Sequence, residues 1–316
     1  MPTTPTLHRH PHDITAVDVE YQYHGHCASH VIVQDGRALI VDVGPNDGVP
    51  RVLAALRELG LGPEAVDYVF LTHVHLDHAG GAGLLLRLLP NARALLHPRG
   101  APHMIDPAKL VAGSKLVYGE AEFKRLYGEI VPIAAERVVT TEDGEHLRLG
   151  TREFDMFYTP GHALHHHTLY DRRARAAFTG DVFGVSYRTF DSARGPWALI
   201  TATPTQFDPE QMRQSIDRIV ALRPEAVYLT HFSRLTQVPQ VAAELHAQID
   251  ATVALARRCA AAPDRHAALA AGFRTLVHER LALHGCQLPA AEIDRLLGLD
   301  IRLSAQGLEA WLDRQR

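Results

Sequence analysis

Four side chains that bind metals well lie within six consecutive residues, His73, His75, Asp77 and His78 in the segment LTHVHLDHAGG (71–81). Residues two apart in an extended segment face the same way, so His73 and His75 can bind one ion together. Where the strand breaks, Asp77 and His78 can turn back toward a second ion about 3.5 Å away, as two-metal sites require. Imidazole and carboxylate ligands suit zinc, iron and manganese, and the absence of cysteine from the segment argues against a closed structural zinc site. The pattern predicts a catalytic metal site.

The alternative interpretation is a histidine-rich loop in a histidine-rich protein, because the chain has 21 histidines among its 316 residues. The spacing also differs from H-E-x-x-H, which places both histidines on one face of a helix. An H-x-H-x-D-H pattern at the end of an apolar strand is improbable by chance. We therefore interpret the segment as half of a two-metal site.

The elements that position this segment indicate an α/β protein. An apolar strand is predicted over 65–73 and a helix over 81–91, and a hairpin over 30–44 turns at Asp35-Gly36, a favoured tight-turn pair. Strands that alternate with helices favour this fold class. Further strands are expected over 145–149, 152–160, 175–181 and 225–231, and further helices over 48–60 and 208–224, the last with Asp208 as N-cap and Gln211 completing a capping box.

The composition changes near residue 236 toward Ala, Leu and Arg. Apolar residues then recur at helical spacing, for example Val241, Leu245 and Ile249, and a last helix is expected to start near Ser304. We predict a catalytic domain over 1–235 and a helical C-terminal region over 236–316 that packs on it.

The H-x-H-x-D-H pattern after an apolar strand resembles the signature of the metallo-β-lactamase-fold superfamily. Four more segments resemble the rest of that pattern in the expected order: ALIVDVG (38–44), YTPGHALHHHT (158–168), AAFTGDVF (176–183) and VYLTHF (227–232). The segments HPRGAPHMIDPAKLV, LYGEIVPI and LSAQGLEAWL are similar to a poorly characterised, stand-alone, hydrolase-like branch of the superfamily.

The resemblance implies an αββα sandwich with a helical C-terminal extension and the metals at one edge. Two divalent ions are expected, with zinc as the first choice and iron or manganese as alternatives. The implied ligands are His73, His75 and His162 for one ion and Asp77, His78 and His231 for the other, with Asp181 shared, while Asp42 lies behind them and orients a ligand histidine.

Several residues near these motifs are candidates for substrate contacts. His165 and His166 follow His162 closely, and a strand would send alternate members of the histidine triplet to opposite faces. Tyr187 and Arg188 follow Asp181 and could also reach a substrate. Ordinary surface histidines and an exposed loop aromatic are equally good interpretations of these residues. In YHGHCASH (23–30), the start of a strand with Cys27 in the core is favoured over a metal site.

The metal site favours a dinuclear metallo-hydrolase that acts on a small ester, thioester, lactone or amide through a hydroxide bridging the two ions. Asp77 is the candidate catalytic residue, which would orient the hydroxide and pass a proton to the leaving group. A single iron would instead indicate a persulfide dioxygenase on the same fold. A nuclease and a metal-binding protein without enzymatic activity are less favoured alternatives. The motif expected around the last histidine of a hydroxyacylglutathione hydrolase is CGHEY, whereas this chain has YLTHFS (228–233).

The net charge and the cysteine content of the chain limit which partners and which compartment are expected. A net charge of -4 without a basic cluster gives no reason to expect nucleic acid or an anionic membrane, so the expected partner is a small-molecule substrate. Three widely spaced cysteines do not form a disulfide framework, and the first residues lack a signal-peptide pattern, so a cytoplasmic protein is expected. The C-terminal helices would form a lid, a homodimer contact or a cover for one face.

Overall fold

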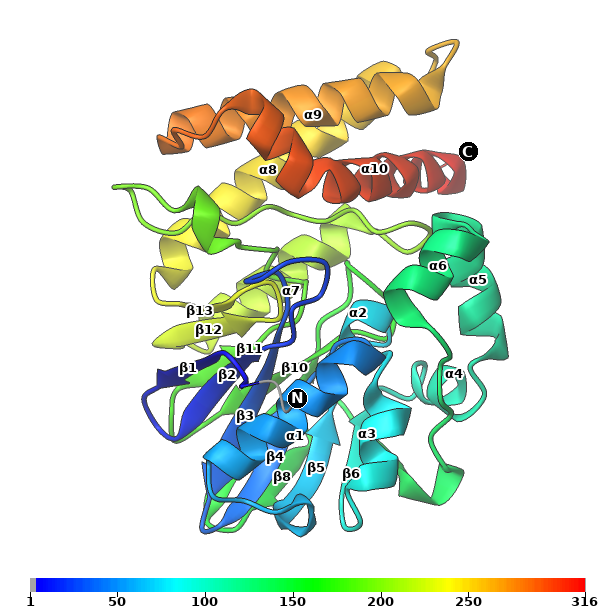
Figure 1. Ribbon diagram of the computed structural model, residues 1–316. Helices are drawn as coiled ribbons and strands as arrows, with labels where there is room; N and C mark the ends of the chain where they lie inside the picture. The colour runs from blue at the N-terminus through cyan, green and yellow to red at the C-terminus, as the bar shows by residue number, and fades with distance from the viewer. Residues whose placement is uncertain (1–3, 316) are drawn as a thin grey trace.

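The computed structural model describes residues 4–315, which form two β-sheets packed face to face between two layers of helices (Figure 1). Three C-terminal helices lie across one end of this sandwich (Figure 1). The predicted αββα sandwich with a helical C-terminal extension is therefore confirmed. Among the described residues, no helix is long and apolar enough to cross a membrane.

The first sheet has seven strands in sequential order. Neighbouring strands from β1 to β4 are antiparallel, and those from β4 to β7 are parallel. The carboxyl ends of β4 and β5 therefore meet at one edge, where Asp42 follows β4 and the motif of residues 71–81 follows β5. The strands are β1 (Leu7–His10), β2 (Ile14–Asp18), β3 (Ala28–Gln34), β4 (Arg37–Val41), β5 (Val66–Phe70), β6 (Arg93–Leu96) and β7 (Val138–Thr140).

The second sheet has six strands in the order β13-β12-β11-β10-β9-β8. All of its pairs are antiparallel except β11 with β12, which run parallel and so end at the same edge. Asp181 follows β11 and His231 follows β12 at this edge. The strands are β8 (His146–Leu149), β9 (Arg152–Tyr158), β10 (His167–Asp171), β11 (Ala176–Phe178), β12 (Ala226–Leu229) and β13 (Ser233–Leu235).

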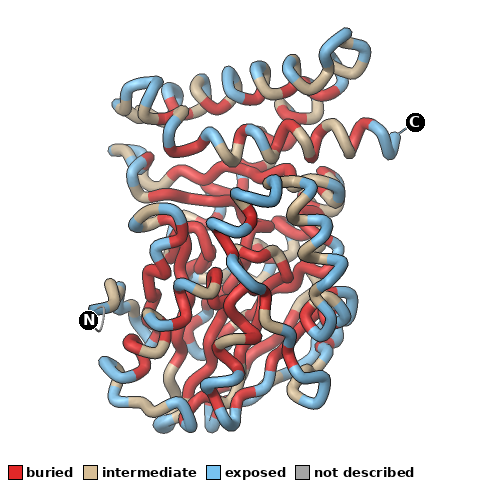
Figure 2. The backbone as a smooth tube through the Cα atoms, turned by 45° about the vertical axis from the view of Figure 1, so that its right-hand side comes forward, coloured by how far each residue is buried: buried red, intermediate tan, exposed pale blue. Residues whose placement is uncertain are grey.

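Side chains alternate between two cores because successive residues of a strand point to opposite faces of its sheet. In β4, Leu39 and Val41 join the core between the sheets, whereas Ala38 and Ile40 pack under the helices of the outer layer. A third core lies between the second sheet and the C-terminal helices. Burial runs through the strands and along one side of the outer helices (Figure 2).

Helices cover both outer faces. Against the first sheet lie α1 (Val49–Glu58), α2 (Leu76–Ala79), α3 (Ala82–Leu88), α4 (Ala101–Ile105), α5 (Ala108–Tyr118) and α6 (Glu120–Tyr127). On the side of the second sheet lie α7 (Pro209–Ala221), α8 (Val238–Cys259), α9 (Arg265–His284) and α10 (Ala290–Arg314). The Asp208 carboxylate caps α7 by accepting from the backbone N–H groups of Glu210 and Gln211.

Two predicted element boundaries are wrong in ways that matter for the site. The strand expected over 65–73 ends at Phe70, so His73 and His75 lie in an irregular segment rather than in a strand. The last helix begins at Ala290 rather than near Ser304, because Gly298 lies inside the helix without breaking it. The earlier start brings Leu299–Ser304 into helical register, and this part of α10 faces the candidate site described below.

Candidate metal centre

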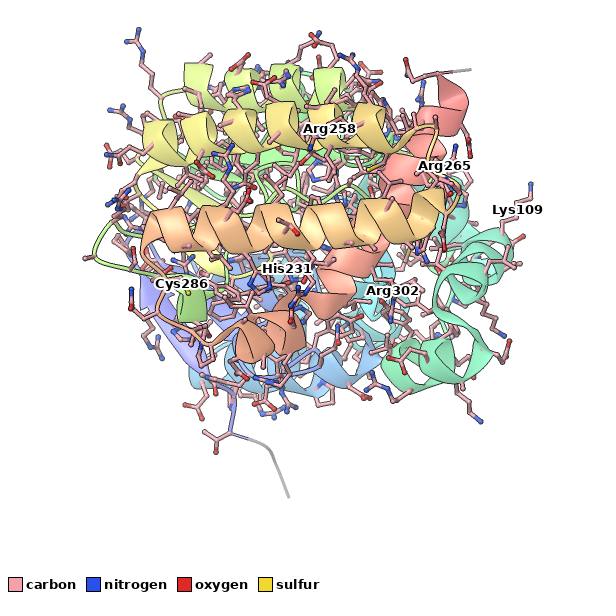
Figure 3. The ribbon with its side chains drawn as sticks, turned by 90° about the horizontal axis from the view of Figure 1, so that it is seen from above. Lys109, His231, Arg258, Arg265, Cys286 and Arg302 are labelled. Atoms are coloured by element: carbon pink, nitrogen blue, oxygen red, sulfur yellow. The ribbon has the colours of Figure 1, made fainter. Side chains whose placement is uncertain are left out.

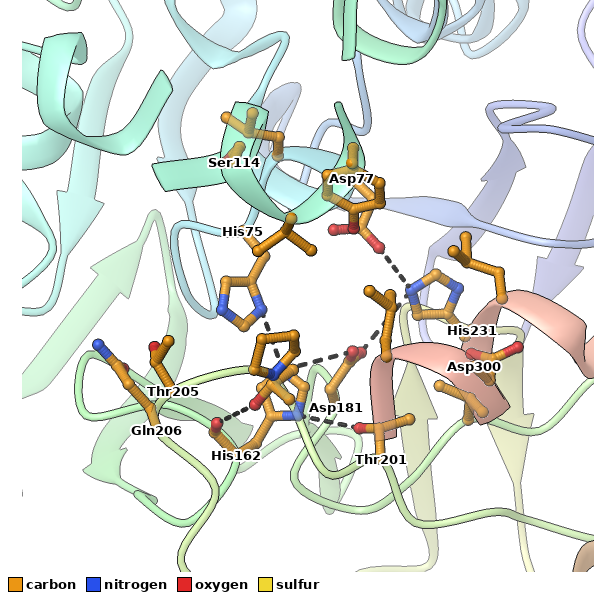
Figure 4. Close-up of a pocket in the computed structure, with 18 of the residues that line it drawn as sticks. His75, Asp77, Ser114, His162, Asp181, Thr201, Thr205, Gln206, His231 and Asp300 are labelled. Atoms are coloured by element: carbon orange, nitrogen blue, oxygen red, sulfur yellow. Dashed lines mark hydrogen bonds and ion pairs between the residues drawn. The ribbon is translucent and has the colours of Figure 1, made fainter. Parts of the chain in front are cut away.

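Seven histidine and aspartate side chains from four separate segments converge at the edge where the two sheets meet. Figure 4 shows His75, Asp77, His162, Asp181 and His231 among them. Three of these segments follow strands β5, β11 and β12, and the fourth lies between β9 and β10. All four segments lie at the same end of the sandwich. The structure thus brings together all of the ligands implied by the sequence resemblance: His73, His75, Asp77, His78, His162, Asp181 and His231.

The first group consists of three imidazoles. Nδ1 of His75 lies 2.9 Å from Nε2 of His73 and 3.1 Å from Nε2 of His162. The ligand atoms of the three residues all lie within 4.8 Å of one another. The arrangement suits one ion bound by three nitrogen atoms.

The second group consists of Asp77, His78 and His231. Oδ2 of Asp77 lies 3.3 Å from Nε2 of His231 and 3.9 Å from Nε2 of His78. Asp181 lies between the two groups, since its Oδ1 is 3.2 Å from Nε2 of His78 and its Oδ2 is 3.6 Å from Nε2 of His162. The Asp181 carboxylate can therefore contact ions in both groups.

The Asp42 carboxylate ties the two sheets together behind the cluster. It accepts hydrogen bonds from the backbone N–H and the hydroxyl of Thr72, from the Thr230 hydroxyl and from Nδ1 of His78. The backbone of Asp42 has a φ of 53°, a conformation that few residues with a side chain adopt. One buried carboxylate thus fixes the segments that follow β5 and β12 and orients His78.

Hydrogen bonds at the far ring nitrogens decide which nitrogen faces the cluster. Nδ1 of His231 donates to the backbone carbonyl of His26 at 2.8 Å, and Nδ1 of His78 donates to Asp42. Nδ1 of His162 lies 2.9 Å from the hydroxyl of Thr201. Because Nδ1 of His78 and of His231 donates to these acceptors, Nε2 of each ring faces the cluster, where it presents a lone pair once that ring is neutral.

Glycine is required at two positions that bring ligand segments close to their neighbours. Gly161, with a φ of 126°, precedes His162, and a Cβ there would overlap the backbone of Met212 at the start of α7. Gly180, with a φ of 47°, precedes Asp181, and a Cβ there would lie 2.6 Å from the hydroxyl oxygen of Thr72. Both glycines permit backbone conformations and approaches that a side chain would prevent.

The donor atoms fit a bound cation on geometry alone. Nε2 of His78 and Oδ1 of Asp181 are buried, lack hydrogen-bond partners among the described residues and face each other at 3.2 Å. A proton on Nε2 of His78 would form an ion pair between these two atoms, and a divalent cation that binds both atoms would take the place of this proton. The residues present therefore fit the divalent ions that the sequence implies.

The pKa values of the cluster depend on burial and on mutual charge. Burial lowers the pKa of His73 and lowers that of His162 to about 3, so both rings are held neutral, the form that binds metals. Burial also disfavours a charged His78, but the carboxylates of Asp181 and Asp77 outweigh it and raise the pKa of His78. Burial opposes ionisation of Asp77, yet His78 and His231 hold its pKa below the usual range.

A cavity of about 330 Å³ opens beside the cluster. One wall is α5, which contributes Leu110, Ser114 and Val117, and the opposite wall is α10, which contributes Leu299 and Leu303. The floor contains the ligand side chains, with tyrosines and threonines around them. Cavities of this size and mixed polarity bind small molecules.

The structure separates the candidate substrate contacts into two kinds. His165 and Tyr187 line the cavity, although Tyr187 is buried rather than exposed. His166 does not line it: its Nδ1 lies 3.0 Å from the hydroxyl of Thr159, and its Nε2 accepts from the backbone N–H of Asp181. Arg188 does not line it either, since its guanidinium bonds to the carbonyl of Ser186. Adjacent histidines diverge because they lie on opposite sides of the backbone as the chain enters β10.

The start of β3 contributes to the surroundings of the site. Cys27 is a buried free thiol, as predicted for a core position, and its Sγ lies 3.3 Å from the carbonyl oxygen of Asp77. Nδ1 of His26 donates to the carbonyl of Tyr21, so its Nε2 accepts from the hydroxyl of Tyr187 at 2.8 Å.

Two residues of the site were missed in the sequence analysis. Thr201, which contacts His162, lies in an irregular segment and carries no recognisable signal. Asp300 lines the cavity from α10, and burial, reinforced by Asp181 and Asp77 and opposed by His231, raises its pKa to about 7. Asp300 follows the apolar positions Ile293 and Leu297 at helical spacing, so an acid on the buried face of this helix was a usable signal.

The comparisons with known proteins agree with this geometry. The family model described as "Metallo-beta-lactamase superfamily" matches residues 23–231. The chain is 30% identical over 181 residues to the metallo-beta-lactamase fold-containing protein ST1585 of Sulfurisphaera tokodaii, covering 53% of this chain and 61% of that protein. It is 35% identical over 132 residues to a hydroxyacylglutathione hydrolase of Citrobacter koseri, covering 42% of this chain and 38% of that protein. The matches thus span less than two thirds of these relatives.

Similar solved structures extend the likeness in fold to the C-terminal helices. The crystal structure of ST1585 from Sulfolobus tokodaii has a TM-score of 0.64 at 20% identity and covers 94% of this chain and 98% of that chain. A metallo-beta-lactamase family protein, TTHA1429 from Thermus thermophilus, has a TM-score of 0.62 at 21% identity and covers 99% of this chain and 92% of that chain. At such identities the likeness concerns the fold alone.

Proposed function

Because the chain belongs to the metallo-β-lactamase superfamily, we propose that it is a metal-dependent hydrolase of a small ester, thioester, lactone or amide. The observation that carries the proposal is the convergence of seven donor groups in one cluster, five of which line a cavity of about 330 Å³: His75, Asp77, His162, Asp181 and His231. A superfamily member without a reaction to catalyse would have no need for both a complete donor set and an adjoining small-molecule cavity.

In this proposal two divalent ions, with zinc expected, are held by the seven residues. His73, His75 and His162 hold one ion, and Asp77, His78 and His231 hold the other, with Asp181 between them. Bound ions of this kind lower the pKa of a water molecule and polarise the carbonyl group of a substrate.

We propose that Asp77 transfers the proton of the attacking water. Its Oδ2 lies toward His231, and among the residues that the structure describes no hydrogen bond occupies its Oδ1. Asp77 also lines the cavity. The free carboxylate oxygen can accept a proton from the attacking water and return it to the leaving group.

The relatives named hydroxyacylglutathione hydrolase support hydrolysis as the class of reaction. Their substrate does not follow, since the aligned part covers 38% of the Citrobacter koseri protein. We therefore propose the bond class and leave glutathione out of the proposal.

The test is elemental analysis of untagged protein together with turnover on a panel of esters, thioesters, lactones and amides. About two zinc or manganese ions per chain and turnover abolished by a chelator are expected. His162→Ala should lose metal and turnover together, whereas His146→Ala, which changes an exposed histidine outside the cavity, should keep both. A single iron with oxygen uptake on a persulfide and no hydrolysis, or full metal content in His162→Ala, would contradict the proposal.

A further inference from the structure

A carboxylate from the C-terminal helix faces the candidate active-site cavity. Asp300 of α10 lines this cavity together with its helix neighbours Leu299 and Leu303. Figure 4 shows Asp300 beside His231, on the side of the cavity opposite His75. Seen from above, His231 lies within the outline of the C-terminal helices (Figure 3). Asp300 therefore places a carboxyl group where a substrate would lie.

The other acidic residues of α10 are all neutralised, and Asp300 differs from them. No ion pair joins Asp300 to a basic side chain anywhere in the described range 4–315. The four neutralised acids of the helix pair as follows: Glu292 with Arg295, Asp294 with Arg274 and His278, Glu309 with Arg265 and His266, and Asp313 with Arg265.

The nearest polar neighbour of Asp300 cannot supply a proton to it. The hydroxyl of Tyr187 lies 3.5 Å from Oδ1 of Asp300, at the limit of a hydrogen bond. That hydroxyl has one proton, which it donates to Nε2 of His26, because Nδ1 of His26 donates to the carbonyl of Tyr21. Apart from this long contact with Tyr187, no side chain of the described residues forms a hydrogen bond or an ion pair with the Asp300 carboxyl group, which lines the cavity.

The nearby cationic side chains do not form an ion pair with Asp300 either. Lys109 lines the cavity from α5, but it is exposed and forms no ion pair with Asp300. Arg302 is exposed, and it lies on a different face of α10 because two residues turn an α-helix by about 200°. Among the described residues, none of the groups that could hold a metal includes Asp300. Burial without a counter-ion raises the pKa of the Asp300 carboxyl group, and a cationic ligand in the cavity would favour its charged form.

We propose that Asp300 binds a protonated amino group of the substrate, so that the substrate is an acyl compound with a cationic end. The inference rests on the proposed hydrolase function, because it treats the cavity as the substrate site. The ammonium would contact the Asp300 carboxylate from within the cavity, close to the hydroxyl of Tyr187, which also lines the cavity. Leu299 and Leu303 provide apolar surface for the carbon chain that links the amine to the acyl group.

A binding experiment tests the recognition without using catalysis. Hexylamine and 1-hexanol, which share a six-carbon chain and differ in charge, are titrated into the full-length protein by calorimetry. Hexylamine should bind at least about tenfold more tightly, the scale of one charge-assisted hydrogen bond. Asp300→Asn should remove this difference. Asp294→Asn, a change on the same helix but outside the cavity, should preserve it.

A kinetic experiment extends the test to turnover. The phenyl esters of 6-aminohexanoic acid and heptanoic acid are matched in length, and kcat/KM should be about tenfold higher for the amino ester. In Asp300→Asn the ratio should fall to about one through loss of the amino ester's advantage, while hydrolysis of heptanoate continues.

The outcomes separate the inference from the proposed function. Equal hydrolysis of both esters with equal binding of amine and alcohol would overturn the role of Asp300 and leave the hydrolase standing. Hydrolysis of neither ester with tight, Asp300-dependent binding of hexylamine would support the recognition of amines and count against hydrolysis of such esters. The comparison of the two ligands on the unaltered protein needs no variant, so it holds even if Asp300→Asn does not fold.

Discussion

Asp77 illustrates how one residue is given its role by its neighbours. His78 and His231 keep its carboxylate ionised in spite of burial, and one of its oxygens remains free toward the cavity. Because a neighbouring histidine cluster sets its charge, the same residue type on the surface, such as Asp47, has no comparable function.

Asp77→Asn should lower kcat by at least about a hundredfold, since an amide cannot accept the proton that a general base takes. The substitution keeps the size of the side chain and an oxygen that can contact the metal, so with zinc in excess the midpoint of chemical unfolding should change less than it does in His162→Ala. Steady-state kinetics on the best substrate and unfolding by denaturant give the two readouts. Asp47→Asn is the matched control. Turnover equal to the parent in Asp77→Asn would refute the proton role.

At the scale of elements, the C-terminal helices position part of the metal centre. The segment that carries Thr201 is fixed from above: the backbone N–H of Ile200 donates to Gln248 of α8, and that of Ala202 donates to Ser304 of α10. Thr201 in turn contacts Nδ1 of His162. A change in the docking of α10 should therefore reach a ligand of the proposed metal site.

Two glycines of α10 provide a matched test of this coupling. A Cβ on Gly307 would overlap the carbonyl oxygens of Ala202 and Thr203, whereas a Cβ on Gly298 would meet open space. Gly307→Ala should lower the free energy of unfolding by about 1–3 kcal/mol, as overpacking does, and should weaken zinc retention against a chelator. Gly298→Ala should raise stability by up to about 1 kcal/mol, because alanine favours helix. Chemical unfolding and chelator titration measure both effects. Unchanged zinc retention in a destabilised Gly307→Ala would show that α10 does not support the site.

At the scale of the whole molecule, buried neutral histidines couple stability to pH. His30 lies between the sheets against Phe178 and Tyr228, and burial lowers its pKa to about 3. His167, stacked on Phe70, is lowered to about 3 for the same reason. Neither residue belongs to the donor cluster, so this effect is separate from metal binding.

The metal-free protein should lose stability as the pH falls from about 6.5 toward 3. In that pH window the unfolded chain takes up protons at these histidines while the folded chain does not, so protonation favours unfolding. The stability that these neutral histidines contribute is therefore fully present only above their pKa in the unfolded chain. Denaturant unfolding at several pH values, in the presence of a chelator, measures the slope. His30→Gln should make it shallower by up to about 1.4 kcal/mol per pH unit. His12→Gln, at an exposed position, should leave it unchanged, and a pH-independent stability would contradict the prediction.

The sequence by itself determined the fold class, and through its resemblance to the superfamily it indicated the candidate donor residues, because the motifs that carry both are local patterns. Strands buried on both faces read as nearly continuous apolar runs, such as Val66–Phe70, and the H-x-H-x-D-H segment follows shortly after this run. The ends of parallel neighbours such as β11 and β12 meet at one edge, so Asp181 and His231 converge there as a consequence of sheet topology.

Only the tertiary structure decided which further side chains reach the cluster. Thr201 comes from an irregular segment, and Asp300 comes from a helix more than a hundred residues after Asp181. The contacts of both residues depend on how α10 packs on the catalytic domain. The divergence of His165 from His166 likewise depends on the path of the backbone into β10. Helical spacing could place Asp300 on the buried face of its helix, but the angle at which that helix docks and the paths of the loops follow from packing between distant parts of the chain.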